Sequence, residues 1–269
     1  MTSSEIKSKA RGSLSNKWGK AALITFCYFV IEFLINFMIS GSERSFPLLS
    51  SLLSIGGAVI SVPLAYGIMM SFMKLKRSEN VEAFDFFTDG FSNFGRAWGI
   101  TWGVVKKLLV PIILIVVLYI ILIATSVSFS LFAISGGLFN STSVSTSASV
   151  TTGLLSVVCG IGLIALYVWV AIKSLFYVLV YQVAYDNPNF SSKEVVEESE
   201  KLMTGKRGKL FCLQLSFIGW AILAVFTLGI GYLWLIPYVQ IAIIAFYKFA
   251  CGDSENKEID GSVIVENEE

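Results

Sequence analysis

The sequence predicts an all-α membrane protein with six transmembrane helices, and three observations lead to this class. The 269 residues have a mean hydropathy of +0.74, with 55% hydrophobic and 14% charged residues, whereas soluble domains carry roughly 25% charged residues. The 38 residues between Lys209 and Lys248 contain no charge. Sixteen of the 20 Lys and Arg residues fall in three short segments, 1–20, 74–107 and 193–209. Lipid is therefore the expected solvent of this chain.

The first crossing is expected over Ala21–Ile39. The preceding residues 1–20 carry five Lys and Arg, and Ile6, Ala10 and Leu14 recur on one helical face, which indicates an amphipathic helix. The apolar run is longer than the core of a signal peptide, and no small-x-small cleavage site follows it. The sequence therefore predicts an uncleaved anchor.

The second crossing is expected over Pro47–Met73, and a charged segment with regularly spaced aromatic residues follows it. These residues recur every three or four positions: Phe84, Phe87, Phe91, Phe94 and Trp98. One interpretation is a short helix lying in the membrane interface. The other is a cytoplasmic helix packed on the crossings. Neither interpretation makes this segment a spanning one.

The third and fourth crossings are expected over Leu108–Ile134 and Gly153–Tyr185. The uncharged Ser- and Thr-rich stretch between them, Gly136–Thr152, predicts a flexible outer loop. Ahead of the third crossing, three glycines spaced by four residues suggest close helix packing: Gly95, Gly99 and Gly103.

A polar helix over Ser192–Thr204 is predicted next, because Ser191 and Glu194 have the spacing of a capping box. The 38 uncharged residues that follow fit two crossings, since one crossing needs about 20 apolar residues. Two glycines in Thr227–Gly231 permit the reversal between these crossings. The membrane domain thus covers residues 1–251, and the acidic tail 252–269 is expected to be disordered and cytoplasmic.

The distribution of basic residues predicts the orientation of the chain. The three basic segments lie on one side of the predicted crossings, whereas the outer loops hold only Arg44. By the positive-inside rule, both termini are cytoplasmic, and the protein is a multi-pass protein of the plasma membrane. The lipid bilayer is its expected partner.

A threefold repeat is predicted from strings that precede the odd-numbered crossings, 14–20, 91–96 and 203–209. In each string an Asn or Gly is placed to end a helix in the left-handed conformation: Asn16, Asn93 and Gly205. The returning helices share a second spacing, because Pro63, Phe72 and Lys74 match Pro237, Phe246 and Lys248. Each unit would be an interfacial helix followed by a transmembrane hairpin.

Four polar or helix-breaking residues lie near the middle of the predicted crossings. Pro63 and Pro237 stand 11 residues from the basic ends of their helices, which is roughly 16 Å. Glu32 and Lys173 lie at a similar depth, where an isolated charge costs at least about 2.5–3.5 kcal/mol. We hypothesise an intramembrane Glu32–Lys173 ion pair, either as a structural clamp or as a substrate or proton site beside helix breaks at the two prolines.

The composition offers little for catalysis or cofactor binding. Histidine is absent, which removes the commonest general base and metal ligand. The four cysteines show no metal-ligand spacing and are interpreted as small hydrophobic residues: Cys27, Cys159, Cys212 and Cys251. We expect no catalytic residues, no cofactor and no metal. The net charge of +1 gives no indication of nucleic-acid binding.

Several motifs together resemble a bacterial integral membrane family known as domain of unknown function 975. They are Glu5–Arg11, Glu198–Ser199, Met203–Lys206, Leu215–Trp220, Gly229–Trp234 and Pro237–Tyr238. The resemblance spans most of the chain and is weakest in the Ser- and Thr-rich loop and the tail. It implies a polytopic plasma-membrane protein, typically from Gram-positive bacteria. The family brings no established activity and no catalytic residues.

Three functions are consistent with this sequence. The first is a non-catalytic membrane protein in transport, as a transport accessory, or in envelope defence; no Walker motif is present, so ATP energy would need a partner. The second is a membrane-embedded enzyme acting on lipid headgroups, with candidate groups at Asp85, Asp89, Arg96 and Lys106–Lys107. The third is a scaffold that recruits a cytoplasmic partner. The sequence favours a non-enzyme.

Overall fold

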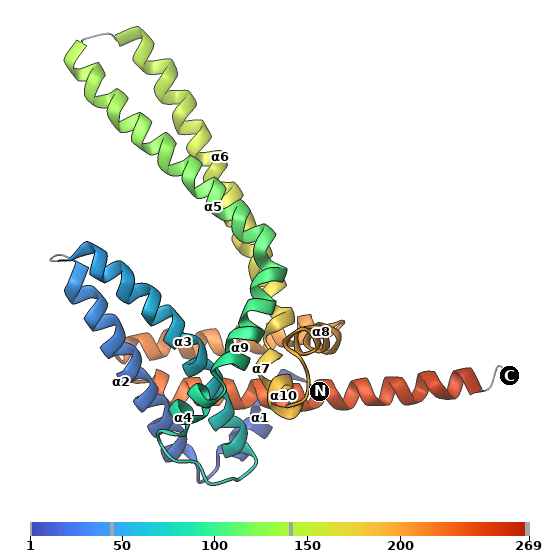
Figure 1. Cartoon of the computed structure of the whole chain (residues 1–269). Helices are drawn as coiled ribbons and strands as arrows, with labels where there is room; N and C mark the ends of the chain where they lie inside the picture. The colour runs from blue at the N-terminus through green and yellow to red at the C-terminus, as the bar shows by residue number, and fades with distance from the viewer. Residues whose placement is uncertain (1, 44–45, 140–141, 267–269) are drawn as a thin grey trace. The chain divides into compact units, whose positions relative to one another are not determined.

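The computed structural model describes the backbone of residues 2–43, 46–139 and 142–266. Side chains within these ranges are described except at 43, 47, 128–129, 131–139, 142–152 and 253–266. The described part of the chain is helical and contains no strand (Figure 1). Its elements, in order, are α1 (Ser3–Leu14), α2 (Trp18–Glu43), α3 (Pro47–Lys76), α4 (Asp85–Ser92), α5 (Phe94–Phe139), α6 (Thr142–Ser174), the 3-10 turn η1 (Leu175–Tyr177), α7 (Val180–Asp186), α8 (Ser192–Met203), α9 (Arg207–Phe226) and α10 (Tyr232–Glu266).

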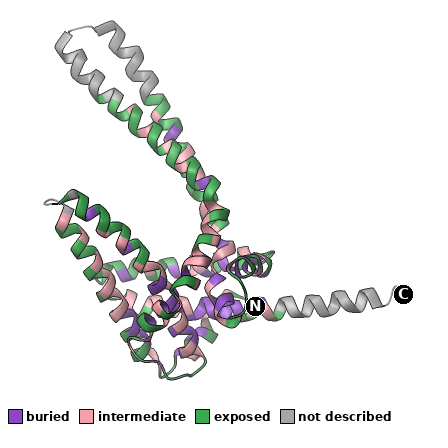
Figure 2. Cartoon of the chain, in the orientation of Figure 1, coloured by how far each residue is buried: buried purple, intermediate pink, exposed green. Residues whose placement is uncertain are grey.

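Six segments of the described chain are long and apolar enough to cross a membrane, as the sequence predicts. They are Trp18–Ser42, Leu48–Lys76, Phe94–Val127, Gly153–Asp186, Arg207–Phe226 and Tyr232–Gly252. In five of them at most 22% of the most apolar window is buried, whereas half of it is buried in Tyr232–Gly252. Figure 2 colours many residues of these helices as exposed. Surfaces of this kind suit lipid as the surrounding solvent.

The chain divides into two compact units, residues 104–174 and the remainder. In the first of these, the facing parts of α5 and α6 approach closely where a Cβ built on Gly162 would lie 3.4 Å from Leu118 Cδ1. In the second, α10 is the central helix and packs against α1, α2, α3, α8 and α9.

The loop predicted over Gly136–Thr152 is largely wrong. α5 runs to Phe139 and α6 begins at Thr142, so only residues 140–141, which lie outside the described residues, separate the two helices. The stretch contains no proline, and Ser and Thr alone disfavour a helix only weakly. The predicted disorder of the tail, residues 252–269, concerns residues whose side chains are mostly not described, and it stays a prediction.

The fourth crossing is interrupted, which the sequence does not predict. α6 ends at Ser174, and η1 leads to α7, which begins at Val180. The amide of Gln182 is buried at this break, and with its nitrogen turned toward the main chain it donates to the carbonyls of Val178 and Leu179. A polar side chain inside an apolar segment thus satisfies main-chain groups that the interruption frees.

The turn between α9 and α10 confirms the reversal predicted at Thr227–Gly231. Leu228 and Gly229 both adopt left-handed conformations, with φ of 54° and 87°. The amide of Gly229 donates to the carbonyl of Ala224 at 3.0 Å, which closes the end of α9. Gly231 is needed for a different reason. It lets the start of α10 approach Ala224 of α9, because a Cβ on residue 231 would lie 2.9 Å from Ala224.

Both polar helices that precede a hairpin have their apolar faces covered by protein. In α1, Ile6, Ala10 and Leu14 are at most 1% exposed, which confirms the predicted face. The capping box of α8 is also confirmed, because Ser191 and Glu194 each bond the other's main-chain amide. The Ser191 amide holds the pKa of the Glu194 carboxyl below its usual value.

Helix α4 packs on α3 through a side chain outside the predicted aromatic stripe. Phe86 is fully buried, whereas Phe84 and Phe87 of the stripe are 61% and 42% exposed. Two glycines let the backbones meet, because a Cβ on Gly67 would lie 1.8 Å from the Phe86 carbonyl oxygen and one on Gly90 would lie 2.3 Å from that of Pro63. The helix is therefore packed on a crossing and still presents an apolar stripe outward.

The two prolines lie inside helices that continue through them. A proline in a helix leaves the carbonyl four residues earlier without its usual donor, and for Pro63 this is the carbonyl of Val59. The indole nitrogen of Trp98 donates to that oxygen at 3.2 Å. The start of α5 is thereby tied to the middle of α3.

The left-handed conformations predicted for the connectors are confirmed at two of three positions. Asn16 follows α1 with φ 62°, and Gly205 follows α8 with φ 75°. Asn93 follows α4 with φ −107°, so the prediction is wrong there. The Asn93 side chain donates to the carbonyl of Asp89, and the chain enters α5 directly.

The residue after each left-handed position is a lysine that bonds a carbonyl near the basic end of a returning helix. Lys17 Nζ donates to the carbonyl of Leu75 and to Ser78 Oγ, both at 2.8 Å. Lys206 Nζ, which is buried, donates to the carbonyl of Ala250 at 2.8 Å. Leu75 lies in the last turn of α3, where the helix dipole favours a cation. Ala250 lies within α10, near the end of its membrane-spanning segment.

Arg96 makes the corresponding contact at the end of α7. Its guanidinium donates to the carbonyls of Pro188, Asn187 and Ala184 at 2.6, 2.7 and 3.0 Å. We call the three contacts of Lys17, Arg96 and Lys206 the basic clasps. Lys17 and Lys206 hold equivalent positions in the predicted repeat, whereas Arg96 does not, and the threefold repeat stays a prediction.

The contact between α3 and α4 yields the first testable prediction. Gly90→Ala should destabilise the protein by about 1–3 kcal/mol or more, because its Cβ would overlap the Pro63 carbonyl and the backbones must separate. The measurement is the free energy of unfolding in mixed micelles.

Gly95→Ala is the matched control, since no atom lies within 4 Å of the added Cβ. Equal effects of the two substitutions would contradict the close packing of α3 and α4.

Candidate functional site

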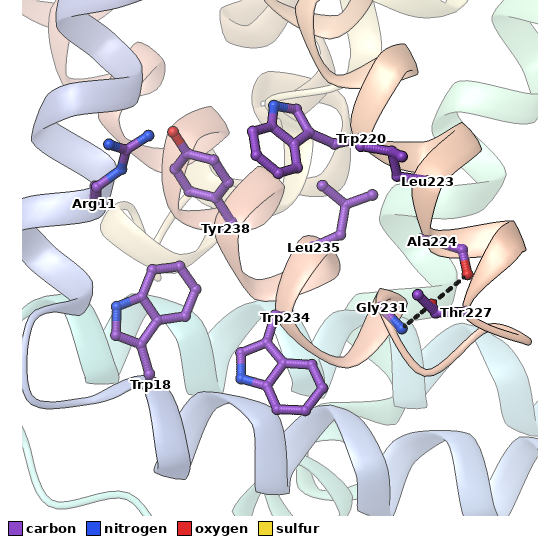
Figure 3. A pocket seen from close by; sticks show the side chains of 10 residues that line it. All are labelled: Arg11, Trp18, Trp220, Leu223, Ala224, Thr227, Gly231, Trp234, Leu235 and Tyr238. Atoms are coloured by element: carbon purple, nitrogen blue, oxygen red, sulfur yellow. Dashed lines mark hydrogen bonds between the residues drawn. The ribbon is translucent and has the colours of Figure 1, made fainter.

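A cavity of about 560 Å³ lies beside the turn between α9 and α10. Aromatic side chains dominate its lining, as Figure 3 shows. The lining residues are Arg11, Trp18, Trp220, Leu223, Ala224, Thr227, Gly231, Trp234, Leu235 and Tyr238. Its volume lies within the range of roughly 300–1,000 Å³ that small-molecule sites occupy. We call it the tryptophan pocket.

Contacts of Tyr238 with α1, α2 and α9 fix one end of the pocket. Its hydroxyl donates to the carbonyl of Lys7 at 3.4 Å. Its ring lies 6.1 Å from that of Trp18 and meets Phe217 edge to face at 5.1 Å. The Tyr238 side chain of α10 thereby contacts α1, α2 and α9.

The opposite end of the pocket is shaped by the turn. Thr227 Oγ1 donates to the carbonyl of Ala224 at 2.8 Å and accepts from the amide of Gly231 at 2.9 Å (Figure 3). These bonds satisfy the polar atoms of the turn locally. The indoles of Trp220 and Trp234 stay about half exposed beside it, at 57% and 49%.

Arg11 is the charged residue of the pocket lining. Its guanidinium lies at the same end as the Tyr238 hydroxyl (Figure 3). It forms no ion pair or hydrogen bond with any residue that the structure describes. A cation at one end of an otherwise apolar, aromatic cavity matches a molecule with an anionic end and an apolar body. Spacing along the chain does not predict this pocket, because its residues come from four separate helices and a turn.

Glu32 belongs to α2, and its side chain contacts α3. Its Oε2 accepts a 3.5 Å hydrogen bond from Ser61 Oγ, and the Tyr28 side chain lies close enough to interact with the carboxylate. Oε1 is buried without a hydrogen-bond partner among the described residues. A buried carboxylate oxygen without a partner is unfavourable in an apolar segment.

Lys173 lies at the end of α6, immediately before the interruption of the fourth crossing. It belongs to the unit formed by residues 104–174, whereas Glu32 belongs to the other unit. The Glu32–Lys173 pair therefore stays a prediction. Of the two prolines named with it, Pro63 lies in α3, the helix that supplies Ser61.

Candidate catalytic groups of the charged segment are held in structural contacts. Asp89 pairs with Lys74 at 2.6 Å, and Asp85 Oδ2 accepts from the amide of Glu82 at 2.9 Å. The Arg96 guanidinium is occupied by main-chain carbonyls. Asp89 thus joins α4 to α3, and Arg96 joins α5 to the end of α7, whereas the Asp85 bond is local to the start of α4.

No group of three His, Cys, Asp or Glu side chains that could hold a metal occurs among the described residues. The four cysteines are not paired with one another in disulfides. The structure therefore offers no candidate metal centre in the part that it describes.

The fold and the pocket define a class, a multi-pass α-helical membrane protein with an aromatic cavity. Residues 1–251 match the family described as "Protein of unknown function (DUF975)", and the chain belongs to this family. This confirms the resemblance noted from the sequence motifs. No curated protein and no solved structure matches the chain.

The hypothesised ion pair yields a second prediction. Glu32→Gln and Lys173→Met should each destabilise the protein, and the double variant should be less destabilised than the sum of the two, with a coupling of at least about 0.5 kcal/mol. Unfolding in mixed micelles measures all three variants.

Ser61→Ala, which removes the observed neighbour of Glu32, provides the comparison. Single variants that fold normally and show no coupling would exclude the pair.

Proposed function

We propose that the protein is a non-catalytic membrane protein that binds amphiphilic molecules and works in transport, as a transport accessory, or in envelope defence. The observation that carries this proposal is the tryptophan pocket with the unpaired Arg11 at one end. Tryptophan is favoured where one side of a site is apolar and the other is wet. An anionic amphiphile in the pocket would place its head at Arg11 and its apolar part among the indoles.

Asp89 and Arg96 of the charged segment already form structural contacts, which favours a binding function over chemistry on lipid headgroups. An enzyme of that kind needs free carboxylates or cations around a reacting group. Asp89 and Arg96 instead hold helices together. The pocket, by contrast, offers binding groups without a recognisable nucleophile.

We further propose that the protein resides in the plasma membrane with both termini cytoplasmic. The three basic segments supply the support, through the positive-inside rule. In this orientation the basic clasps lie at the inner face.

The test is a deletion strain profiled against membrane-active amphiphiles and for lipid composition. Deletion should change the sensitivity of the cells to amphiphiles, and the wild-type chain should restore it. An Arg11→Gln chain should fail to restore it although it reaches the membrane, because the pocket loses its cation.

Lys20→Gln is the matched control, since Lys20 is an exposed lysine outside the pocket lining. An unchanged sensitivity combined with an altered lipid composition would overturn the proposal and favour lipid chemistry.

A further inference from the structure

A second cavity, of about 430 Å³, is lined by lysines from three helices. Lys9 belongs to α1, Lys76 ends α3, and Lys248 belongs to α10. Gly12, Ser13 and Ala245 complete the lining. No atom lies within 4 Å of a Cβ built on Gly12, so the wall beside the lysines leaves room for a ligand.

Lys76 is the unusual member of this cluster. Its Nζ is buried and has no hydrogen-bond partner among the described residues. Lys9 and Lys248 lie close enough to repel its charge. An ammonium that is removed from water without a partner is strongly unfavourable, and two neighbouring cations increase the cost.

Neighbouring lysines show that partners are available to cations in this part of the fold. Lys74 pairs with Asp89, and Lys17 bonds the carbonyl of Leu75 beside Lys76. None of Lys9, Lys76 and Lys248 forms an ion pair with a described carboxylate. The cluster therefore concentrates positive charge that the described protein does not neutralise.

We propose that this cluster is a binding site for a phosphate group. Three lysines from separate helices line one space, and lysine binds phosphate oxygens as a point charge. Lys76 is also the last residue of the second membrane-spanning segment, so the site lies where the apolar span ends and headgroups begin. The phosphate can belong to a lipid headgroup or to a soluble molecule, and the two sources share this chemistry.

The site is separate from the tryptophan pocket. Lys9 and Arg11 are two residues apart on α1, which places them roughly 200° apart around the helix. The two cavities share no lining residue. The phosphate site is thus an addition to the proposed function and does not depend on it.

The test uses the full chain reconstituted in nanodiscs. In phosphatidylcholine nanodiscs, the affinity for inorganic pyrophosphate is measured by calorimetry. In nanodiscs that also contain phosphatidylglycerol, retained phosphatidylglycerol is counted by native mass spectrometry after extraction. Binding of pyrophosphate identifies a soluble phosphate as the ligand, and retention of phosphatidylglycerol alone identifies a lipid headgroup.

Lys76→Gln should weaken the observed binding at least about tenfold, because one charge-assisted contact is lost. Lys248→Gln should act in the same direction, and because Lys248 is exposed this substitution should leave the fold intact. Lys193→Gln is the control, since its side chain is 84% exposed on α8. The absence of binding in both nanodiscs, or binding that neither cluster variant weakens, would overturn the proposal.

Discussion

The contact on which this structure depends is a cation bonded to main-chain carbonyls at the basic end of a returning helix. The last four carbonyls of a helix have no donor within the helix, so a basic side chain that reaches them can satisfy them. Lys17 and Arg96 supply donors at the ends of α3 and α7, and Lys206 supplies one to α10 near the end of its span. Each donor follows a short polar helix closely in sequence, so one contact fixes both the hairpin and its connector.

Some charged side chains form structural contacts, and others have no partner among the described residues. The carboxylate of Asp89 and the guanidinium of Arg96 are used to join helices. Arg11 and Lys76 have no partner among the described residues, and both line cavities. Charges that stay unsatisfied in a membrane protein are the usual markers of function. The two cavities are therefore the places where binding is proposed.

Features set by residues within one helix or its connector could be predicted from the sequence. The buried face of α1, the capping box of α8 and the left-handed Gly205 follow from spacing along one helix. Contacts between distant helices were not predictable in this way. The break before α7 depends on Gln182 and not on a proline, and the tryptophan pocket assembles residues more than 200 positions apart. The left-handed conformation predicted at Asn93 is wrong because the Asn93 side chain bonds the preceding turn of α4.

The measurement that tests the shared basic face most directly is cysteine labelling of intact cells in a chain without its native cysteines. Asn80, Asn189 and Thr204 are exposed, and each stands near one basic clasp. Cysteines there should resist an impermeant maleimide until the membrane is permeabilised, whereas Leu228→Cys in the α9–α10 turn should react at once. Leu228 is 94% exposed at the tip of this turn, so its reactivity reports which side of the membrane the tip faces. A protected Leu228→Cys, or clasp positions that react on opposite sides, would contradict one basic face shared by three spanning hairpins.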